Sequence, residues 1–266
     1  MKLRILSDLH VDVNRKYSRK RFLWVDKDIL TIIAGDIAGS LEVTARFLRM
    51  HFNNVVFVGG NHILYNDDYK PIQQLHRDYR AEFPLDSAIS YLENDCKMVD
   101  DVVFIGATLW TDYTYGGNQS ENMLLAATSM NDFAFGRFEE EGETVPLRAE
   151  HCLEMFEESL NFIKTTYDKF NNTEKKIVLI VHHGISPKAL TEKYRNSRYN
   201  AVYVSDLENY VTQNMSNLAL VVHGHIHSRL KYRIGDIPVI CNPCGYVIDQ
   251  EDRKTPIWVR DLIIDV

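Results

Sequence analysis

The chain has 266 residues, 45% of them hydrophobic, which is enough to bury a large core as one domain spanning residues 1–266. The longest apolar stretch is about six residues, far short of the roughly 20 that span a bilayer, so neither a transmembrane helix nor a membrane partner is expected. The formal net charge of −7 disfavours a broad nucleic-acid-binding surface, which normally carries an excess of Lys and Arg. The N-terminus shows no signal-peptide features, and we expect a cytoplasmic protein.

Five short apolar runs along the chain each lead into residues that can bind metals. The runs KLRIL, ILTIIA, VVFV, IVLIV and LALVV precede Asp8-Leu-His10, Gly35-Asp36, Gly59-Gly60-Asn61-His62, His182-His183 and His223-Gly224-His225-Ile-His227. Runs that are apolar on both faces suit central strands of a buried sheet, and the carboxyl ends of such strands form the ligand crevice of open α/β sheets. We therefore expect the five strand ends to converge on one site.

Helical patterns alternate with these strands over the first hundred residues. They cover residues 41–52 and 71–82 and are followed by a strand at 102–106. Such alternation favours an α/β fold over a helical bundle. The stretch 108–176 interrupts the alternation, and an insertion between two site-bearing strands is a natural place for residues that shape a substrate pocket.

The remaining elements lie in the insertion and in the C-terminal part of the chain. We expect helices over 121–130 and 147–170, an acidic loop at 139–143, and strands of a second, partly antiparallel sheet at 229–234, 237–241 and 257–264. The tetrapeptide from Ser205 to Glu208 is typical of a capping box that starts a helix ending near Asn214. His151 falls on a predicted helix surface and is expected to be solvated.

The candidate ligands are carboxylates, imidazoles and one amide, with no thiolate among them. Such a set suits manganese, iron, zinc or cobalt and leaves room for water at a catalytic site. Two metals roughly 3.5 to 4 Å apart need a bridging ligand, and Asp36 in its Gly-Asp turn is the simplest choice. We assign one metal to Asp8, His10, Asp36 and His227, and the other to Asp36, Asn61, His182 and His225. A water between the ions would lose a proton near neutral pH and attack a phosphoryl group, so the set predicts phosphate-ester hydrolysis.

The order of the motifs, D-x-H, G-D, G-N-H, H and G-H-x-H, resembles that of the calcineurin-like metallophosphoesterases from Asp8 to His227. The resemblance implies an α/β fold, a four-layer α/β/β/α sandwich with two central mixed sheets, and a dinuclear metal centre at the sheet edge. Its ligand pattern gives the same division between the two metals. The sequence segments at 104–110, 130–132 and 203–208 are similar to the corresponding segments of a small bacterial branch of the family.

His62 is, by this resemblance, the catalytic residue that donates a proton to the leaving oxygen or stabilises the transition state. In the family an acidic residue usually follows this histidine and orients its ring, whereas Ile63 stands here. Asp67 or Asp68 from the same loop could replace that carboxylate.

Other residues near the motifs each have two interpretations. His183 and His223 adjoin ligands and are expected to orient metal-bound groups by hydrogen bonding rather than to bind a metal themselves. Four side chains are candidates for substrate contact: Arg19, Arg198, Tyr199 and Trp110. The first lies in a basic cluster over 15–21, and the next two lie in a mixture of cations and aromatics over 193–199 that could stack a base and hold its phosphate. The alternatives are solvated loops for both segments and core packing for Trp110.

Three functions are compatible with the sequence. The first is a metal-dependent phosphohydrolase that acts on a small phosphoester, a phosphodiester or a nucleotide. The second is a nuclease of the same superfamily, against which the acidic balance and the lack of an obvious DNA-binding extension weigh. The third is a non-catalytic metal-binding scaffold. Loss of ligands would mark such a scaffold, and none of the expected ligands is missing.

Overall fold

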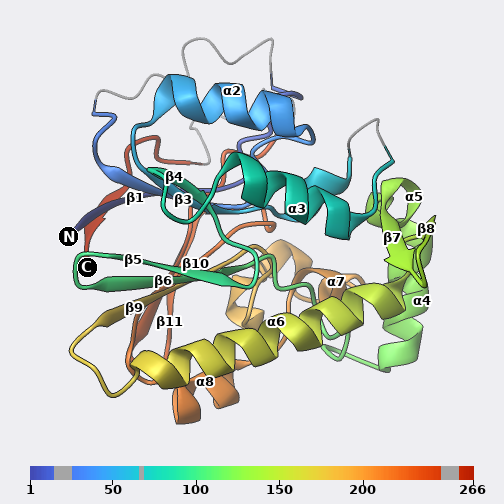
Figure 1. Cartoon of the computed structure of the whole chain (residues 1–266). Coiled ribbons are helices and arrows are strands. Elements are labelled where there is room, and N and C mark those ends of the chain that lie inside the picture. The colour runs from blue at the N-terminus through green and yellow to red at the C-terminus, as the bar shows by residue number, and fades with distance from the viewer. Residues whose placement is uncertain (15–25, 66–68, 247–257) are drawn as a thin grey trace.

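Two stacked β-sheets form the centre of the computed structural model, which describes residues 1–14, 26–65, 69–246 and 258–266 (Figure 1). The first sheet has the strand order β13 (Ile263–Asp265), β1 (Lys2–Leu6), β2 (Leu30–Ala34), β3 (Val55–Val58) and β4 (Ile89–Tyr91). The second has the order β11 (Leu230–Ile234), β12 (Ile237–Cys241), β10 (Leu218–His223), β9 (Lys176–Val181), β6 (Val102–Ala107) and β5 (Asp95–Val99). Both sheets are mixed, because antiparallel pairs at their edges flank parallel central strands.

Helices cover the outer faces of both sheets (Figure 1). The helices α2 (Leu41–His51) and α3 (Ile72–Glu82) lie over the first sheet, whereas α6 (Ala149–Phe170) and α8 (Glu208–Asn214) lie over the second. The predicted four-layer α/β/β/α sandwich is therefore confirmed. No helix among the described residues is long and apolar enough to cross a membrane.

Alternate residues of the central strands face opposite sides of their sheet, which divides the core into two halves. In β2, Ile32 and Ala34 pack in the cluster between the sheets, while Ile33 packs in the larger cluster beneath the helices. All six residues of β6 are buried. A strand that is covered on both faces needs apolar residues at every position, and this explains the continuous apolar runs of the sequence.

The strands that precede the candidate ligands are parallel within each sheet. In the first sheet β1 pairs with β2 and β2 pairs with β3, and in the second sheet β9 pairs with β10. Backbone hydrogen bonds continue past the strand ends, from Asp8 N to Gly35 O and from Asp36 N to Gly59 O, each at 3.0 Å. The five predicted strand ends therefore lie at one edge of the sandwich.

The insertion at 108–176 forms two helices and a hairpin before α6, which lie beside one another at one end of the molecule (Figure 1). These elements are α4 (Gln119–Ser129), α5 (Asn131–Phe135), β7 (Arg137–Glu140) and β8 (Glu143–Pro146). The acidic segment is thus a hairpin and not the loop that we expected. Glu141 and Gly142 form its two-residue turn, with φ of 51° and 84°, and positive φ at both positions is what such a turn requires.

Residues 258–264, the described part of the strand expected at 257–264, do not join the second sheet as expected. They lead into β13, which runs antiparallel to β1 at the edge of the first sheet. The side chain of Asn242 holds this segment, since its Nδ2 donates to the carbonyls of Ile5 and Val259, each at 2.8 Å. Such long-range bonds leave no local mark in the sequence.

Two local expectations are also wrong. Helix α8 begins at Glu208 without a side-chain cap, and Ser205 Oγ instead accepts a hydrogen bond from the backbone N of Asp112 at 3.0 Å. His151 is buried rather than solvated, and its ring stacks on Phe138 with 4.0 Å between centroids. In both cases a residue of the insertion, Asp112 or Phe138, makes a contact that the local sequence pattern did not predict.

Candidate metal centre

The predicted ligands lie in the turns that follow β1, β2, β3, β9 and β10. Hydrogen bonds join the turns of the two sheets: His182 Nδ1 donates to Ala34 O at 2.8 Å, and the backbone N of His225 donates to Asp8 Oδ1 at 2.9 Å. These bonds bring all seven predicted ligands into one region of the structure.

Several of these turns have an uncommon backbone conformation. Five of the predicted ligands have positive φ between 44° and 66°: Asp8, His10, Asp36, His225 and His227. Non-glycine residues adopt this region rarely, and when they do so together they cluster at functional sites. The conformation turns consecutive side chains sharply at the strand ends, so that they point into a common space.

One group of donors consists of Asp8, His10 and His227. The Nε2 atoms of His10 and His227 are 3.0 Å apart, and His227 Nε2 lies 3.4 Å from Asp8 Oδ1. The other oxygen of Asp8 is buried and has no hydrogen-bond partner among the described residues. Three ligand atoms therefore face one point.

A second group consists of Asp36, His182 and His225, with Asn61 beside them. His182 Nε2 lies 3.3 Å from Asp36 Oδ2 and 3.0 Å from Asn61 Oδ1. His225 Nε2 is buried and lacks a hydrogen-bond partner in the described part of the chain.

Asp36 lies between these two groups, and with His10 and His62 it forms a third cluster of donors. Its Oδ2 is 3.3 Å from His182 Nε2 and 3.9 Å from His10 Nε2, while its Oδ1 accepts a hydrogen bond from the backbone N of His62 at 3.0 Å. One carboxylate thus reaches both groups, as the sequence-based assignment of a bridging ligand requires.

Burial and charge prepare these side chains to bind a cation. Burial lowers the pKa of His10 to about 3 and that of His225 well below its ordinary value, so both imidazoles keep a free lone pair at neutral pH. Burial opposes ionisation of Asp36, but the charge of His182 and His62 holds the pKa of Asp36 well below its usual range. Burial also opposes charge on His182, yet Asp36 raises the pKa of His182 to about 9, so metal binding at His182 would release a proton.

The donor set fits divalent metal ions. In each group the ligand atoms lie within 4.8 Å of one another. Unpartnered buried oxygen and nitrogen atoms carry a large desolvation cost, which a bound cation would offset. Nitrogen and oxygen donors without thiolate are typical of manganese, iron and zinc sites in hydrolases.

The pattern of the calcineurin-like phosphoesterases matches residues 1–229, most of the chain. The protein belongs to the calcineurin-like phosphoesterase family. With its clustered Asp and His donors, it is a metal-dependent phosphoester hydrolase, a metallophosphoesterase.

Other proteins resemble this phosphoesterase along most of its length. It is 24% identical to the uncharacterized protein L509 of Acanthamoeba polyphaga mimivirus, over 99% of this chain and 98% of that protein. Its fold is similar to that of the phosphopantetheinyl hydrolase from Mycobacterium tuberculosis, with a TM-score of 0.71, 18% identity, and coverage of 98% of this chain and 95% of that one. A putative 5′-nucleotidase from Staphylococcus aureus gives a TM-score of 0.45 at 13% identity, over 91% of this chain and 48% of that one.

Two glycines of the phosphoesterase allow its donors to approach closely. Gly35 has φ of 89°, and a Cβ there would clash with the ring of His182. Gly60 has φ of 76°, and a Cβ there would clash with Asp36 Oδ1 and lie 2.7 Å from the backbone N of the same residue. Only glycine combines this backbone conformation with the space that the donors occupy.

His62 lies at the rim of the metal centre. Its Nε2 is 3.1 Å from the hydroxyl of Tyr246 and 3.7 Å from Asp36 Oδ2, and its side chain is 12% exposed. Ile63, where the family usually has an acidic residue, is buried in the core. The candidate replacements Asp67 and Asp68 lie outside the described residues.

Asp132 is a buried residue that we did not single out from the sequence. Its Oδ1 accepts hydrogen bonds from Asn61 Nδ2 at 2.7 Å and from the hydroxyl of Tyr65 at 3.2 Å. Burial raises the pKa of Asp132. The available signal was the segment at 130–132, which shows no spacing relation to the ligands.

His183 and His223, which were predicted to orient the ligands, are both buried but have different neighbours. His183 is buried, and its ring lies 4.3 Å from that of His225. His223 is buried too, but its Nε2 faces the hydroxyl of Tyr232 at 3.1 Å rather than a predicted ligand.

The four candidate substrate contacts also have different positions. Tyr199 lines the pocket above the donors, and the exposed Arg198 donates to its hydroxyl at 2.9 Å. Trp110 is 5% exposed and packs in the core, with its ring 5.3 Å from that of His183. Arg19 lies outside the described residues.

Proposed function

We propose that the protein uses a dinuclear metal centre to hydrolyse a small phosphoester, a phosphodiester or a nucleotide. The position of Asp36 between two groups of donors is the observation that carries this proposal. The first ion would be held by Asp8, His10, Asp36 and His227, and the second by Asp36, Asn61, His182 and His225. Manganese, iron and zinc suit the donor types. When bound, the two ions would activate a water and neutralise charge on the attacked phosphoryl group.

Side chains of the protein would supply the rest of the chemistry. Asp36 Oδ1 accepts a hydrogen bond from the backbone N of His62, so the turn that carries the carboxylate is linked directly to the turn that carries the candidate acid. His62 Nε2 lies 3.1 Å from the Tyr246 hydroxyl, and it can donate a proton to a leaving oxygen that takes the place of this hydroxyl. We assign the catalytic role to His62 on this geometry and on the family resemblance.

The insertion at 108–176 would help to choose the substrate. Its residues Ser129, Met130 and Asn131 line the same pocket as the donors, and Asp132 holds Asn61. We treat residues 1–266 as one domain in which this insertion forms part of the pocket wall. His183 and His223 would stiffen the strand ends rather than bind an ion.

Two further expectations stay proposals. No disulfide joins the four cysteines, all of which lie in the described residues, and this is consistent with a reducing, cytoplasmic location. We also propose that the chain belongs to a small bacterial branch of the family. The sequence segments at 130–132 and 203–208 carry this similarity, and residues of both line the pocket.

The proposal is tested by loading the protein with Mn²⁺ and offering a chromogenic phosphomonoester, a phosphodiester, cyclic nucleotides and single-stranded DNA. Metal content is measured in parallel on the protein and on Asp36→Asn, which keeps the shape of the side chain and removes its charge. We expect two ions per chain, hydrolysis of a small ester, and loss of both in the variant. Hydrolysis of DNA alone would favour the nuclease. Full metal loading without activity on any substrate would favour the scaffold.

A further inference from the structure

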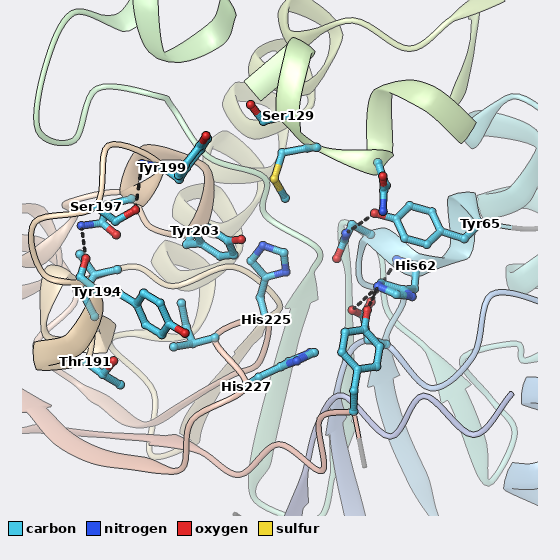
Figure 2. Close-up of a pocket in the computed structure, with 18 residues that line it drawn as sticks. His62, Tyr65, Ser129, Thr191, Tyr194, Ser197, Tyr199, Tyr203, His225 and His227 are labelled. Carbon is cyan, nitrogen blue, oxygen red and sulfur yellow. Dashed lines mark hydrogen bonds and ion pairs between the residues drawn. The ribbon is translucent and has the colours of Figure 1, made fainter. Parts of the chain in front are cut away.

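The pocket that opens on the metal centre has one wall rich in tyrosine. This tyrosine wall consists of Tyr194, Tyr199 and Tyr203. Figure 2 shows it across the pocket from His62 and Tyr65. The cavity has a volume of about 490 Å³, within the range of sites for small organic ligands. The ring of Tyr203 lies 5.0 Å from that of His225, so the wall directly adjoins the predicted metal donors.

The chain segment that carries the wall is held in place by buried bonds. It includes the short helices η4 (Glu192–Tyr194) and α7 (Asn200–Tyr203). The buried Asn200 donates from Nδ2 to the carbonyls of Tyr194 and Arg195, each at 2.9 Å. A ligand would therefore meet a backbone that is already ordered at Tyr194, which lowers the entropy cost of binding.

The wall is aromatic and neutral on the side that faces the pocket. The guanidinium of Arg198 lies 5.0 Å from the ring centroid of Tyr199, and the ammonium of Lys193 lies 4.8 Å from that of Tyr194. Neither cation lines the pocket, and no other Lys or Arg does so among the described residues. The polar groups beside the rings are hydroxyls and amides, from Ser129, Thr191, Ser197 and Asn200.

This composition discriminates between classes of substrate. In the described part of the chain, no cationic side chain lines this side of the pocket to pair with a second phosphate. A planar ring without charge can instead lie against the tyrosine faces and use the hydroxyls and amides along its edge. A purely aliphatic group would bury apolar area but would leave the neutral donors and acceptors unused.

We infer that the tyrosine wall binds an uncharged, planar ring, such as a nucleobase, that the substrate carries beside its phosphate. The inference deepens the proposed function and rests on it, because the ring belongs to the phosphoester that the metal centre would attack. The ring contacts Tyr194, Tyr199 or Tyr203 while the phosphate lies over the donors on the pocket floor.

Binding of two phosphonates to the Mn²⁺-loaded protein tests the inference without catalysis. The probes are the 5′-deoxy-5′-phosphonate of adenosine and the same ribose phosphonate without the base. Their carbon–phosphorus bond is not a phosphoester, so the protein does not consume them. Isothermal titration calorimetry should show at least about tenfold tighter binding of the adenosine compound, the size that base–aromatic stacking gives. Equal affinities, or failure of both probes to bind at millimolar concentration, would overturn the inference.

Substitutions in the tyrosine wall test whether its rings cause the difference in affinity between the two probes. Tyr194→Ala and Tyr199→Ala are chosen because Tyr194 is exposed and Tyr199 is half-buried, so their loss should leave folding intact, which thermal melting checks. At least one of them should reduce the affinity ratio of the two probes severalfold. Tyr210→Ala, on α8 and outside the pocket, is the matched control and should leave the ratio unchanged. A tenfold ratio that survives in both wall variants and in Tyr203→Leu would also refute the assignment.

Failure of the inference and failure of the proposed function give different results. A preference for the adenosine probe, with no hydrolysis of any ester by the metal-loaded protein, contradicts only the proposed function. Hydrolysis of a small ester together with equal affinities for the two probes contradicts only the tyrosine wall.

Discussion

Asp132 Oδ1 accepts a hydrogen bond from the side-chain amide of Asn61 at 2.7 Å, although 71 positions separate the two residues. The amide nitrogen is committed to this bond, so Asn61 Oδ1 points toward His182 Nε2, 3.0 Å away. A carboxylate of the insertion thus orients a predicted metal ligand that follows β3. Contacts of this kind fix ligand geometry and commonly change metal affinity or activity by 10- to 100-fold.

Replacing Asp132 with Ala should weaken the second metal site. Without the acceptor, the Asn61 amide is free to rotate, and we expect metal affinity at that site to fall about 10- to 100-fold. Metal content after dialysis at limiting Mn²⁺, measured by mass spectrometry, should drop from two ions toward one. Asp132→Asn can still present an oxygen to Asn61 and should retain more metal than Asp132→Ala. Equal occupancy in the protein and in both variants would show that Asp132 does not orient the ligand.

Changing His62 to Ala should reduce turnover far more than metal content. The imidazole lies at the rim, and the variant keeps the hydrogen bond from the backbone N of residue 62 to Asp36 Oδ1, so both ions should remain. A positioned general acid contributes about 10²- to 10⁴-fold, and kcat should fall by a factor in that range. The check is to measure kcat and bound metal on the same preparation, with Tyr246→Phe as a companion that removes only the hydroxyl beside the ring. A parallel loss of metal and activity would instead make His62 part of the metal site.

The sequence predicted the architecture and the convergence of ligands for a physical reason. Strands such as β2 and β6 are buried on both faces, so each is a continuous apolar run, and the polar residues after such a run must lie at the sheet edge. The side chains that complete the site could not be placed in this way. Asp132 and Tyr246 reach it through folding of distant segments, and nothing in their local sequence distinguishes them from other polar residues. For Trp110 the sequence position was informative but not decisive, because a residue that follows a strand can line a pocket or pack in the core.

A methyl group at Gly60 should disrupt the metal centre. Gly60→Ala places a Cβ against the side chain and the backbone N of Asp36, and neither can move without moving the turn. Gly142→Ala is a matched control, since Gly142 also has positive φ, 84°, but a Cβ added there would meet no atom within 4 Å among the described residues. Gly142→Ala should lose about 1 to 2 kcal/mol from backbone strain. Gly60 has ψ of −177°, in a region that is essentially restricted to glycine, so Gly60→Ala should lose about 1 to 3 kcal/mol more from strain and overpacking together. Denaturant unfolding in the presence of a chelator measures both, and equal losses would rule out the clash.

Glu93 should make stability depend on pH independently of the metal ligands. The carboxylate is buried and accepts hydrogen bonds from the backbone N and the hydroxyl of Thr108, and burial raises its pKa from 4.5 to about 7. Between these values the unfolded chain has released the proton and the folded chain still holds it, so the free energy of unfolding falls as pH rises from about 4.5 to about 7 and then levels off. At about 1.4 kcal/mol per pKa unit, the fall is roughly 3 kcal/mol.

Comparison with Glu93→Gln isolates this contribution, because all other titrating groups are shared. Between pH 4.5 and pH 7, the free energy of unfolding of the protein should fall by roughly 3 kcal/mol relative to that of the Glu93→Gln variant. Glu157→Gln, an exposed position on α6, should give a difference that does not change with pH. Chelator-treated samples in urea at pH 4.5, 5.5, 6.5 and 7.5 provide the measurement. A difference for Glu93→Gln that stays constant over this range would mean that the buried carboxylate titrates at an ordinary pH, and that the Thr108 hydrogen bonds outweigh the effect of burial.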